Sequence, residues 1–224
     1  MKVVITGTSS GIGKETALKF LSMGHEVIGL DIEDKSITLC PGYKYTHYVC
    51  DISKKESLPQ IEGTEILINN AGVQTMSQKD IDVNLTGTMN VTSMYAFNPK
   101  IKSVLFNSSA SALTGNEFPE YAASKAGVNG YMKYCAIKLA NKYKATCNAL
   151  CFGGVITELN NEVMQDKKLW DSIMNVTPLK RWATAKEAAE WIYFMTVTNT
   201  FCTGQAIEIS GGERNCTDLF VWPE

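Results

Sequence analysis

The sequence predicts an α/β protein in which a doubly wound parallel sheet is covered by helices on both faces, giving three layers. Short, almost continuously apolar runs alternate with longer stretches of helical periodicity along the chain. Such runs are typical of parallel strands that are buried on both faces, and their alternation with helices is typical of crossover connections. No repeat, low-complexity tract or linker divides the sequence, so we expect residues 1–224 to form one domain.

Seven apolar runs are expected to form the strands. They cover residues 3–6, 26–30, 45–50, 66–68, 104–106, 146–151 and 206–209. Apolar residues at helical spacing predict helices over residues 12–23, 121–144 and 184–195. Gly24 is expected to end the first helix, and Thr184 with Glu187 forms a capping box at the start of the last one.

The composition is that of an ordinary globular protein, with 45% hydrophobic and 20% charged residues. The net charge of −2 predicts no attraction to nucleic acid or to anionic lipid. No apolar run approaches the ~18 residues that a membrane helix needs. Because the first predicted strand follows Met1 and Lys2 directly, we expect no leader peptide and a cytoplasmic location.

Cysteine usage favours buried structural thiols. The seven cysteines are an odd number, contain no C-x-x-C pair and are accompanied by only two histidines, so we expect no metal site. They are Cys40, Cys50, Cys135, Cys147, Cys151, Cys202 and Cys216.

A glycine-rich turn lies between the first predicted strand and the first predicted helix, with the sequence Thr6-Gly7-Thr8-Ser9-Ser10-Gly11-Ile12-Gly13. Glycine allows close backbone approach, and a helix start presents free N–H groups to an anion. The turn therefore predicts a Rossmann-like site for the pyrophosphate of a dinucleotide.

Asp31 ends the second predicted strand, 18 residues after Gly13, where its carboxylate can bind an adenosine ribose. The same carboxylate would repel a 2′-phosphate, and Ser9 and Ser10 supply no cation to offset it. Lys14 is the one basic residue of the turn. NAD(H) is therefore favoured over NADP(H).

Tyr121 and Lys125 stand four residues apart in the long predicted helix and share one face. A free tyrosine titrates near ~10, and a neighbouring cation lowers that value. Ser109, twelve residues upstream, can then share a substrate oxygen with Tyr121.

Taken together, these motifs resemble those of the short-chain dehydrogenase/reductase family in its single-domain form. They follow one another along almost the whole chain: TGxxxGxG at 6–13, Asp31, Asp51, NNAG at 69–72, Asn84, Ser108-Ser109, Tyr121 with Lys125, and the last strand followed by Gly211-Gly212.

The resemblance implies an oxidoreductase that interconverts a secondary alcohol and a ketone by hydride transfer with NAD(H). Tyr121 would be the general acid/base, and Lys125 would lower its pKa and hold the nicotinamide ribose. Ser109 would polarise the carbonyl, with Ser108 as a rival because the interval to Tyr121 is one residue shorter than usual. Asn84 would hold a water that links Lys125 to solvent.

The resemblance also implies a cofactor site, in which the family's usual proline is replaced by Phe152. The residues expected at the cofactor are Gly7, Ser9, Ser10, Gly11, Ile12, Gly13, Asp31, Ile32, Asp51, Ile52, Asn70, Ala71, Gly72, Tyr121, Lys125, Val155 and Thr157.

Two intervals are short for the family. Fourteen residues separate Asn70 from Asn84, and 18 separate Asp51 from Asn69. We expect two trimmed helices as a result. One of them often forms the subunit interface in the family, which weakens the expectation of a tetramer. The resemblance still implies a homo-oligomer, and dimer and tetramer both stay open.

Residues 158–177 are expected to form a substrate lid. Leu159, Val163, Trp170 and Met174 lie at spacings that place them on one helical stripe, and the stripe is widened by Met164, Leu169 and Ile173. The segment shows no strong cap at either end. A closing apolar lid favours a hydrophobic alcohol or ketone as substrate, whereas a stripe that simply packs on the domain predicts nothing about substrate.

Two other functions are alternatives to this enzyme. A catalytically silent, redox-sensing NAD(H)-binding protein would be free to lose Tyr121, Lys125 or Ser109, and all three are present. A nucleotide-sugar epimerase or dehydratase needs a further substrate domain that 224 residues do not accommodate. The substrate itself stays open among 3-oxoacyl thioesters, hydroxysteroids, sugars or polyols, and small diketones.

Overall fold

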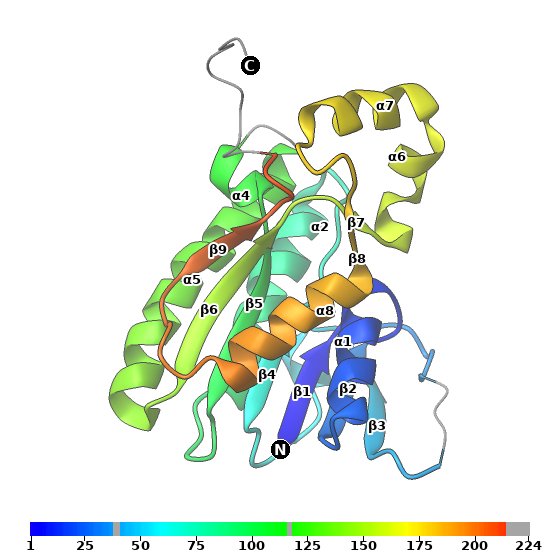
Figure 1. Cartoon of the computed structure of the whole chain (residues 1–224). Helices are drawn as coiled ribbons and strands as arrows, with labels where there is room; N and C mark the ends of the chain where they lie inside the picture. Colours follow the sequence, from blue (N-terminus) through cyan, green and yellow to red (C-terminus); the bar gives the residue numbers. More distant parts are fainter. Residues whose placement is uncertain (38–40, 116–117, 214–224) are drawn as a thin grey trace.

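In the computed structural model, which describes residues 1–37, 41–115 and 118–213, one sheet of parallel strands runs through the molecule (Figure 1). Within these ranges the strand order is β3-β2-β1-β4-β5-β6-β9, and each neighbouring pair is parallel. The strands are β1 Lys2–Thr6, β2 Glu26–Asp31, β3 Tyr45–Val49, β4 Ile66–Asn69, β5 Ser103–Ser109, β6 Thr146–Phe152 and β9 Ala206–Ile209. The order reverses direction between β1 and β4, which makes the sheet doubly wound.

Helices cover both faces of the sheet, so the predicted three-layer α/β architecture is confirmed (Figure 1). The longer helices and their continuations are α1 Gly11–Ser22, η2 Ile81–Gly87, α3 Thr88–Tyr95, α5 Pro119–Tyr143, α8 Ala185–Tyr193 and η4 Phe194–Thr198. The shorter ones are η1 Lys55–Ser57, α2 Gln78–Asp80, α4 Ser111–Thr114, η3 Glu158–Asn160, α6 Asn161–Gln165 and α7 Lys167–Val176. The capping box at Thr184 and Glu187 is present as predicted.

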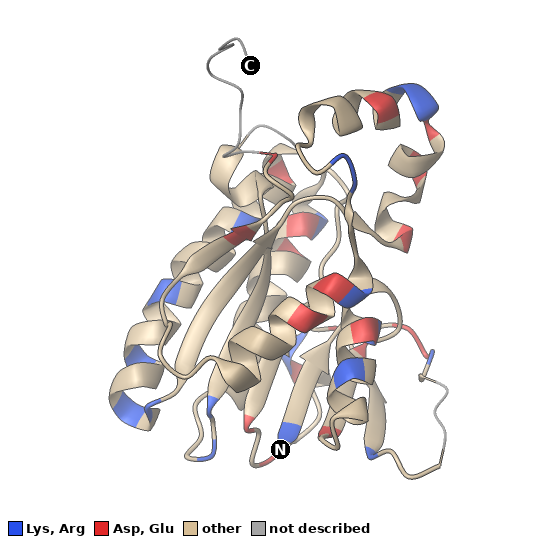
Figure 2. Ribbon diagram, in the orientation of Figure 1, with Lys and Arg blue, Asp and Glu red and all other residues tan. Residues whose placement is uncertain are grey.

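Two apolar cores result from the alternation of side chains along each strand. Val4 and Val104 face one way and pack with α3 and α5, where Met132 and Leu139 are fully buried. Ile5 and its neighbours face the other way and pack with α1 and α8. Figure 2 shows the central strands of the sheet almost without charged residues, as burial on both faces requires.

The crossovers that the sequence predicts to be trimmed are short in the structure. Between β3 and β4, the described residues contain only the single 3₁₀ turn η1. After β4, the three-residue α2 leads into η2, a π-helix, and then into α3. The sequence did not predict the two-stranded sheet of β7 (Val155–Ile156) and β8 (Ala183–Thr184).

Within the described part of the chain, no helix combines the length and the apolar character that crossing a membrane requires.

Candidate active site

The residues singled out from the sequence gather at the carboxyl ends of the parallel strands. The glycine-rich turn follows β1, Asp31 ends β2, Asn70 follows β4 and Ser109 ends β5. In doubly wound sheets the ligand crevice lies at this edge, where the strand order reverses. The fold therefore brings motifs from distant parts of the sequence to one place.

The glycine-rich turn leaves no space for side chains at its tightest point. Gly7 has a left-handed φ of +75°, and a Cβ on Gly13 would overlap the carbonyl oxygen of Gly7. Ser10 precedes α1 and makes no side-chain cap hydrogen bond, and the first turn of α1 has no acidic residue. The first N–H groups of α1 are therefore suited to an anion.

Asp31 is fixed by two backbone amides. Its carboxylate accepts a hydrogen bond of 2.9 Å from the amide of Ser9 and one of 3.0 Å from the amide of Glu33. The first bond joins the end of β2 to the glycine-rich turn, so the carboxylate is held beside the place predicted for the adenosine ribose. The adjacent Ile32 is 64% exposed.

A hollow of about 280 Å³ lies beside this point, and Lys14 and Lys35 are among its lining residues. Lys35 is a second cation that the sequence did not place near Asp31. Its ammonium group is 3.4 Å from the carboxylate of Glu33, which offsets part of its charge. Ser9 and Ser36 also line the hollow.

A second polar chain buttresses the glycine-rich turn from β3. The Tyr45 hydroxyl donates to the Thr8 hydroxyl at 3.0 Å, and it also lies 3.1 Å from Nδ1 of His47. Gly29 of β2 makes room for this contact, because a Cβ there would overlap both hydroxyl oxygens. Sequence reasoning missed this contact between Tyr45 and Thr8, because an aromatic residue in a strand is typical of the apolar core.

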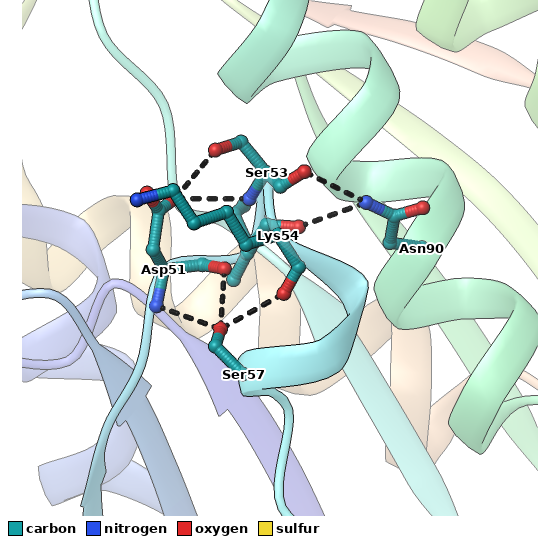
Figure 3. A network of polar contacts seen from close by, with 6 residues as sticks. Asp51, Ser53, Lys54, Ser57 and Asn90 are labelled. Carbon is teal, nitrogen blue, oxygen red and sulfur yellow. Dashed lines mark hydrogen bonds and ion pairs between the residues drawn. The ribbon is translucent and has the colours of Figure 1, made fainter.

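Asp51 belongs to a compact polar network after β3 (Figure 3). Its carboxylate accepts from the backbone amide and the hydroxyl of Ser53, at 3.0 and 2.7 Å, and lies 3.6 Å from the Lys54 ammonium. The hydrogen bond from the Ser53 hydroxyl is the main cause that lowers the pKa of Asp51. Asn90 of α3 donates to the carbonyl oxygens of Ile52 and Ser53, so the network ties the loop to α3.

Asn70 ties the glycine-rich turn to the ends of β4 and β5. Its amide nitrogen donates to the carbonyl oxygens of Thr6 and Gly7, and its amide oxygen accepts from Asn107 at 2.8 Å. The Thr6 hydroxyl accepts the backbone amides of Asn70 and Ala71, both at 2.9 Å. Sequence reasoning missed the roles of Thr6, which begins the glycine-rich turn, and of Asn107, which directly precedes Ser108.

Lys125 is buried at the centre of the site. Its ammonium donates to the carbonyl oxygen of Asn107 at 2.9 Å and lies 5.7 Å from the centre of the Tyr121 ring. The side chain is only 5% exposed, and burial lowers its pKa from the usual 10.5 to about 8. Tyr121 and Lys125 therefore lie together on one face of α5, with the Lys125 ammonium buried beside the ring.

Asn84 lies in the π-helix η2 and uses both of its amide protons within the protein. It donates to the carbonyl oxygen of Val73 at 2.8 Å and to the Ser124 hydroxyl at 3.0 Å, and it accepts from the Val73 amide at 2.8 Å. The amide oxygen of Asn84 and the ammonium of Lys125 are each 3.2 Å from the position that a Cβ on Gly72 would occupy. The structure thus brings Asn84, Gly72 and Lys125 together.

The two serines at the end of β5 have different neighbours. The Ser108 hydroxyl donates to the backbone carbonyl of Lys125 at 3.4 Å, whereas the Ser109 hydroxyl accepts from the backbone amide of Ser111 at 3.1 Å. Both are buried, at 4% and 8% exposure. An acceptor contact leaves the hydroxyl hydrogen of Ser109 available for a further acceptor.

The segment after β6 closes the site against the glycine-rich turn. A methyl carbon of Thr157 lies 3.3 Å from the position that a Cβ on Gly11 would occupy, so the two segments touch. Val155 is buried in β7 and pairs with Ala183. Thr157 and Gly11, both expected at the cofactor, therefore lie next to one another.

The segment 158–177 differs from the single stripe that the sequence predicts. Asp166 is extended and separates α6 from α7, so the predicted spacings run across a break between two helices. Inside the segment, the Asp166 side chain accepts from the Leu169 amide and caps α7, whereas Thr157, at its N-terminal end, makes no side-chain cap hydrogen bond. No residue of α6 or α7 is buried, which argues against the alternative that the stripe is core.

The described cysteines are free thiols. Burial raises the pKa of Cys50 and of Cys135 to about 11, so neither is a thiolate at neutral pH. Burial also raises the pKa of Cys147 and of Cys151. The predicted structural role fits these residues, while Cys40 and Cys216 lie outside the described ranges.

Comparison with known proteins agrees with this geometry. A sequence model for a family described as enoyl-(acyl carrier protein) reductase matches residues 7–213. The chain is 31% identical over 239 aligned residues to the 3-oxoacyl-(acyl-carrier-protein) reductase FabG of Thermotoga maritima, and the match covers 93% of this chain and 96% of the relative.

Two solved structures extend the comparison to cofactors. A 4-hydroxyisoleucine dehydrogenase complexed with NADH has a TM-score of 0.85 at 26% identity, covering 96% of this chain and 99% of that one. A protein described as a 2-deoxy-D-gluconate 3-dehydrogenase from Agrobacterium tumefaciens, with bound NADP, has a TM-score of 0.83 at 24% identity and 95% coverage of each chain. The fold is thus one that binds nicotinamide dinucleotides.

Proposed function

Because the chain belongs to the short-chain dehydrogenase/reductase family, we propose that it interconverts a secondary alcohol and a ketone with NAD(H). The observation that carries the proposal is the buried ammonium of Lys125, placed 5.7 Å from the Tyr121 ring at the carboxyl edge of the sheet. Burying a cation costs free energy. The position of this cation beside the tyrosine of the motif supports a functional role for it.

The described residues fit a dinucleotide. The turn at Gly7 and Gly13 excludes side chains, the start of α1 offers backbone N–H groups, and Asp31 is held where a ribose is expected. When bound, the nicotinamide supplies or accepts the hydride. Gly72 keeps the space between Asn84 and Lys125 open at the other end of the site.

Tyr121 is the proposed general acid/base. The positive charge of Lys125 stabilises the phenolate that forms when Tyr121 gives its proton to the developing alkoxide, and it aids the reverse transfer in alcohol oxidation. Ser109 donates its hydroxyl hydrogen to the same substrate oxygen and polarises the carbonyl. Because burial brings the pKa of Lys125 to about 8, Lys125 can return a proton near neutral pH.

Asn84 acts mainly by position in this proposal. Its amide group is committed to Val73 and Ser124, so the loop that carries Gly72 is held against α5 beside Lys125. In this proposal the water relay that was predicted at Asn84 runs beside the side chain, and it does not use the amide protons of Asn84. A π-helix at this point is consistent with a functional role, because such bulges are frequent at functional sites.

NAD(H) is the proposed cofactor. Two backbone amides fix the Asp31 carboxylate beside the glycine-rich turn, so it cannot swing away from a 2′-phosphate without breaking both hydrogen bonds. Lys14 and Lys35 border the neighbouring hollow, and Lys35 is partly neutralised by Glu33. These contacts support the proposal that repulsion of a 2′-phosphate by Asp31 outweighs its attraction to the two lysines.

A hydrophobic ketone or alcohol is the proposed substrate. Val163, Trp170 and Met174 of the segment 158–177 are half-buried, and Leu159 and Leu169 are 56% and 44% exposed. An apolar side left uncovered in this way suits a lid that a substrate with hydrocarbon or ring surface would complete.

We also propose a homo-oligomer. Three exposed aromatic residues follow one another from α8 toward the edge strand β9: Trp191, Phe194 and Phe201, at 41%, 48% and 95% exposure. Large exposed aromatic side chains beside an open sheet edge are typical of an interface between subunits. Light scattering coupled to size-exclusion chromatography measures the assembly.

The test of the activity is NADH consumption with a panel of cyclic, aromatic and aliphatic ketones, followed by NAD reduction with the matching alcohols. The proposal expects turnover with at least one hydrophobic pair. A chain that binds NADH tightly and turns over no member of either panel would instead support the alternative hypothesis of a catalytically silent, redox-sensing protein.

A further inference from the structure

The indole of Trp182 lies directly against Gly154, in the segment expected to hold the nicotinamide. Trp182 is only 7% exposed, and a Cβ on Gly154 would overlap three atoms of its five-membered ring. Gly154 is not among the glycines with a left-handed φ. Its backbone conformation is therefore open to other residues, and the contact with Trp182 is what requires glycine at position 154.

The segment between β6 and β7 has little of its own to fix its shape. Phe152 stands where a proline would lock the backbone, and two glycines follow it. Two backbone hydrogen bonds hold the segment, from Gly153 to the carbonyl of Ile209 at 3.0 Å and from Ala183 to the carbonyl of Gly154 at 3.1 Å. Because Ala183 directly follows Trp182, the indole and the second hydrogen bond act from the same short stretch.

Stability alone does not explain a tryptophan at position 182. Among the described residues, its indole N–H has no hydrogen-bond partner. A buried donor without an acceptor costs about 1–3 kcal/mol, which a phenylalanine ring at the same place would avoid. The larger indole does reach a second element, since the Trp170 ring of α7 packs edge-on against it at 4.9 Å between centroids and 75° between planes.

We propose that Trp182 is a positioning residue that sets the backbone at Gly154 and Val155 for the nicotinamide and couples it to the lid through Trp170. The indole packs against Gly154 on one side and contacts α7, through Trp170, on another. Movement of the lid is thereby transmitted to the nicotinamide segment. This inference rests on the proposed function in one respect, namely that the nicotinamide end of the cofactor occupies this side of the site.

Ligand binding to Trp182→Phe separates a positioning role from a purely structural one. We expect the affinity for NADH to fall about tenfold, or ~1.4 kcal/mol, while the affinity for ADP-ribose, which lacks nicotinamide, changes less than about twofold. The matched control is Trp191→Phe, which removes a partly exposed indole from α8 and should change neither affinity. Equal effects of Trp182→Phe on both ligands, or no effect on either, would overturn the proposal.

A size exchange tests the contact itself. Gly154→Ala places a methyl group into the indole and should weaken NADH binding, whereas Gly154→Ala with Trp182→Leu restores space and should recover part of the loss. Losses that simply add in the double variant would contradict the contact. Thermal unfolding of each variant checks that it is folded. If Trp182→Phe does not fold, Trp182→Tyr takes its place in the comparison of NADH with ADP-ribose.

These readouts stand apart from the proposed activity. A wild-type protein that binds NADH but reduces no ketone would refute the activity and leave the comparison of NADH with ADP-ribose intact. Conversely, an active enzyme in which Trp182→Phe binds both ligands normally would refute only the role of Trp182.

Discussion

The two ends of the proposed cofactor site are built in different ways. At the adenosine end, the carboxylates of Asp31 and Asp51 are held by hydrogen bonds from nearby backbone and side-chain groups, and the Tyr45 hydroxyl braces Thr8. At the nicotinamide end, the buried Lys125 ammonium donates to a neutral backbone carbonyl, and a tryptophan donor is unpaired among the described residues. The segment 158–176 above it contributes no buried residue.

This difference indicates that cofactor binding and the chemical step depend on opposite ends of the site. A fully paired polar network holds one geometry and tolerates little movement, which suits a binding site that is the same in every turnover. A buried cation and an uncovered apolar lid are costly until a ligand arrives, which suits the end where charge develops and where a substrate enters and leaves. Substitutions at the two ends should therefore have different kinetic signatures.

Lys125→Met should have the largest effect, because it removes the cation beside Tyr121 and a proposed contact to the nicotinamide ribose together. We expect turnover to fall by roughly three orders of magnitude, within the usual range for acid/base catalysis. The KM for NADH should rise as well. Steady-state kinetics at saturating ketone measures both, and a turnover within a factor of a few of wild type would show that the buried ammonium has no catalytic role.

Asp31→Ala changes the adenosine end and should alter cofactor choice with little effect on the chemical step. The ratio of kcat/KM for NADH to that for NADPH should fall by about ten- to a hundredfold, or ~1.4–2.7 kcal/mol, because repulsion of a 2′-phosphate and the ribose hydrogen bonds are both lost. Lys35→Ala is the matched control for the opposite charge. A wild-type enzyme that already prefers NADPH would contradict the account of Asp31.

Trp170→Ala tests the lid and should act on the substrate more than on the cofactor. We expect the KM for a hydrophobic ketone to rise several-fold, about 1 kcal/mol of lost apolar contact, with a smaller change in NADH affinity. The control is Lys168→Ala, which removes an exposed side chain of the same helix outside the apolar stripe and should leave both values unchanged. Activity confined to sugars or polyols, together with a kinetically silent Trp170→Ala, would show that α7 is not a lid for an apolar substrate.

A further prediction concerns stability and pH, and it involves no change in catalysis. Since burial lowers the pKa of Lys125 from 10.5 to about 8, the unfolded chain binds more protons than the folded protein between these values. The free energy of unfolding of wild type should therefore rise, relative to Lys125→Met, as the pH increases from 8 to 10.5. Denaturant unfolding of both proteins across this range cancels contributions from other groups, and a difference independent of pH would mean that Lys125 is not desolvated.

The sequence was sufficient for the elements whose burial is complete. All seven strands of the large sheet were predicted, and β4 and β6, which are buried along their whole length, consist mostly of apolar residues. The same holds for α5, whose buried face includes Val128, Met132 and Leu139. Where tertiary burial and local pattern agree, hydrophobic periodicity identifies the element.

Elsewhere, the sequence was insufficient for a physical reason. The break at Asp166 was missed because residues on both sides keep apolar spacing, and one extended residue leaves no mark on that pattern. β7 and β8 are two residues each, too short for any period to register. Asn107, whose carbonyl holds Lys125, acts through its backbone, and backbone contacts are not visible in residue type.

Tyr121→Phe tests the central claim most directly, because it removes the proposed proton donor and keeps the ring beside Lys125. Wild type and variant are compared for NADH oxidation with the best ketone of the panel and for NADH affinity by fluorescence titration. The account predicts a fall in turnover of roughly two to four orders of magnitude with almost unchanged NADH affinity. Near-normal turnover in Tyr121→Phe would contradict it.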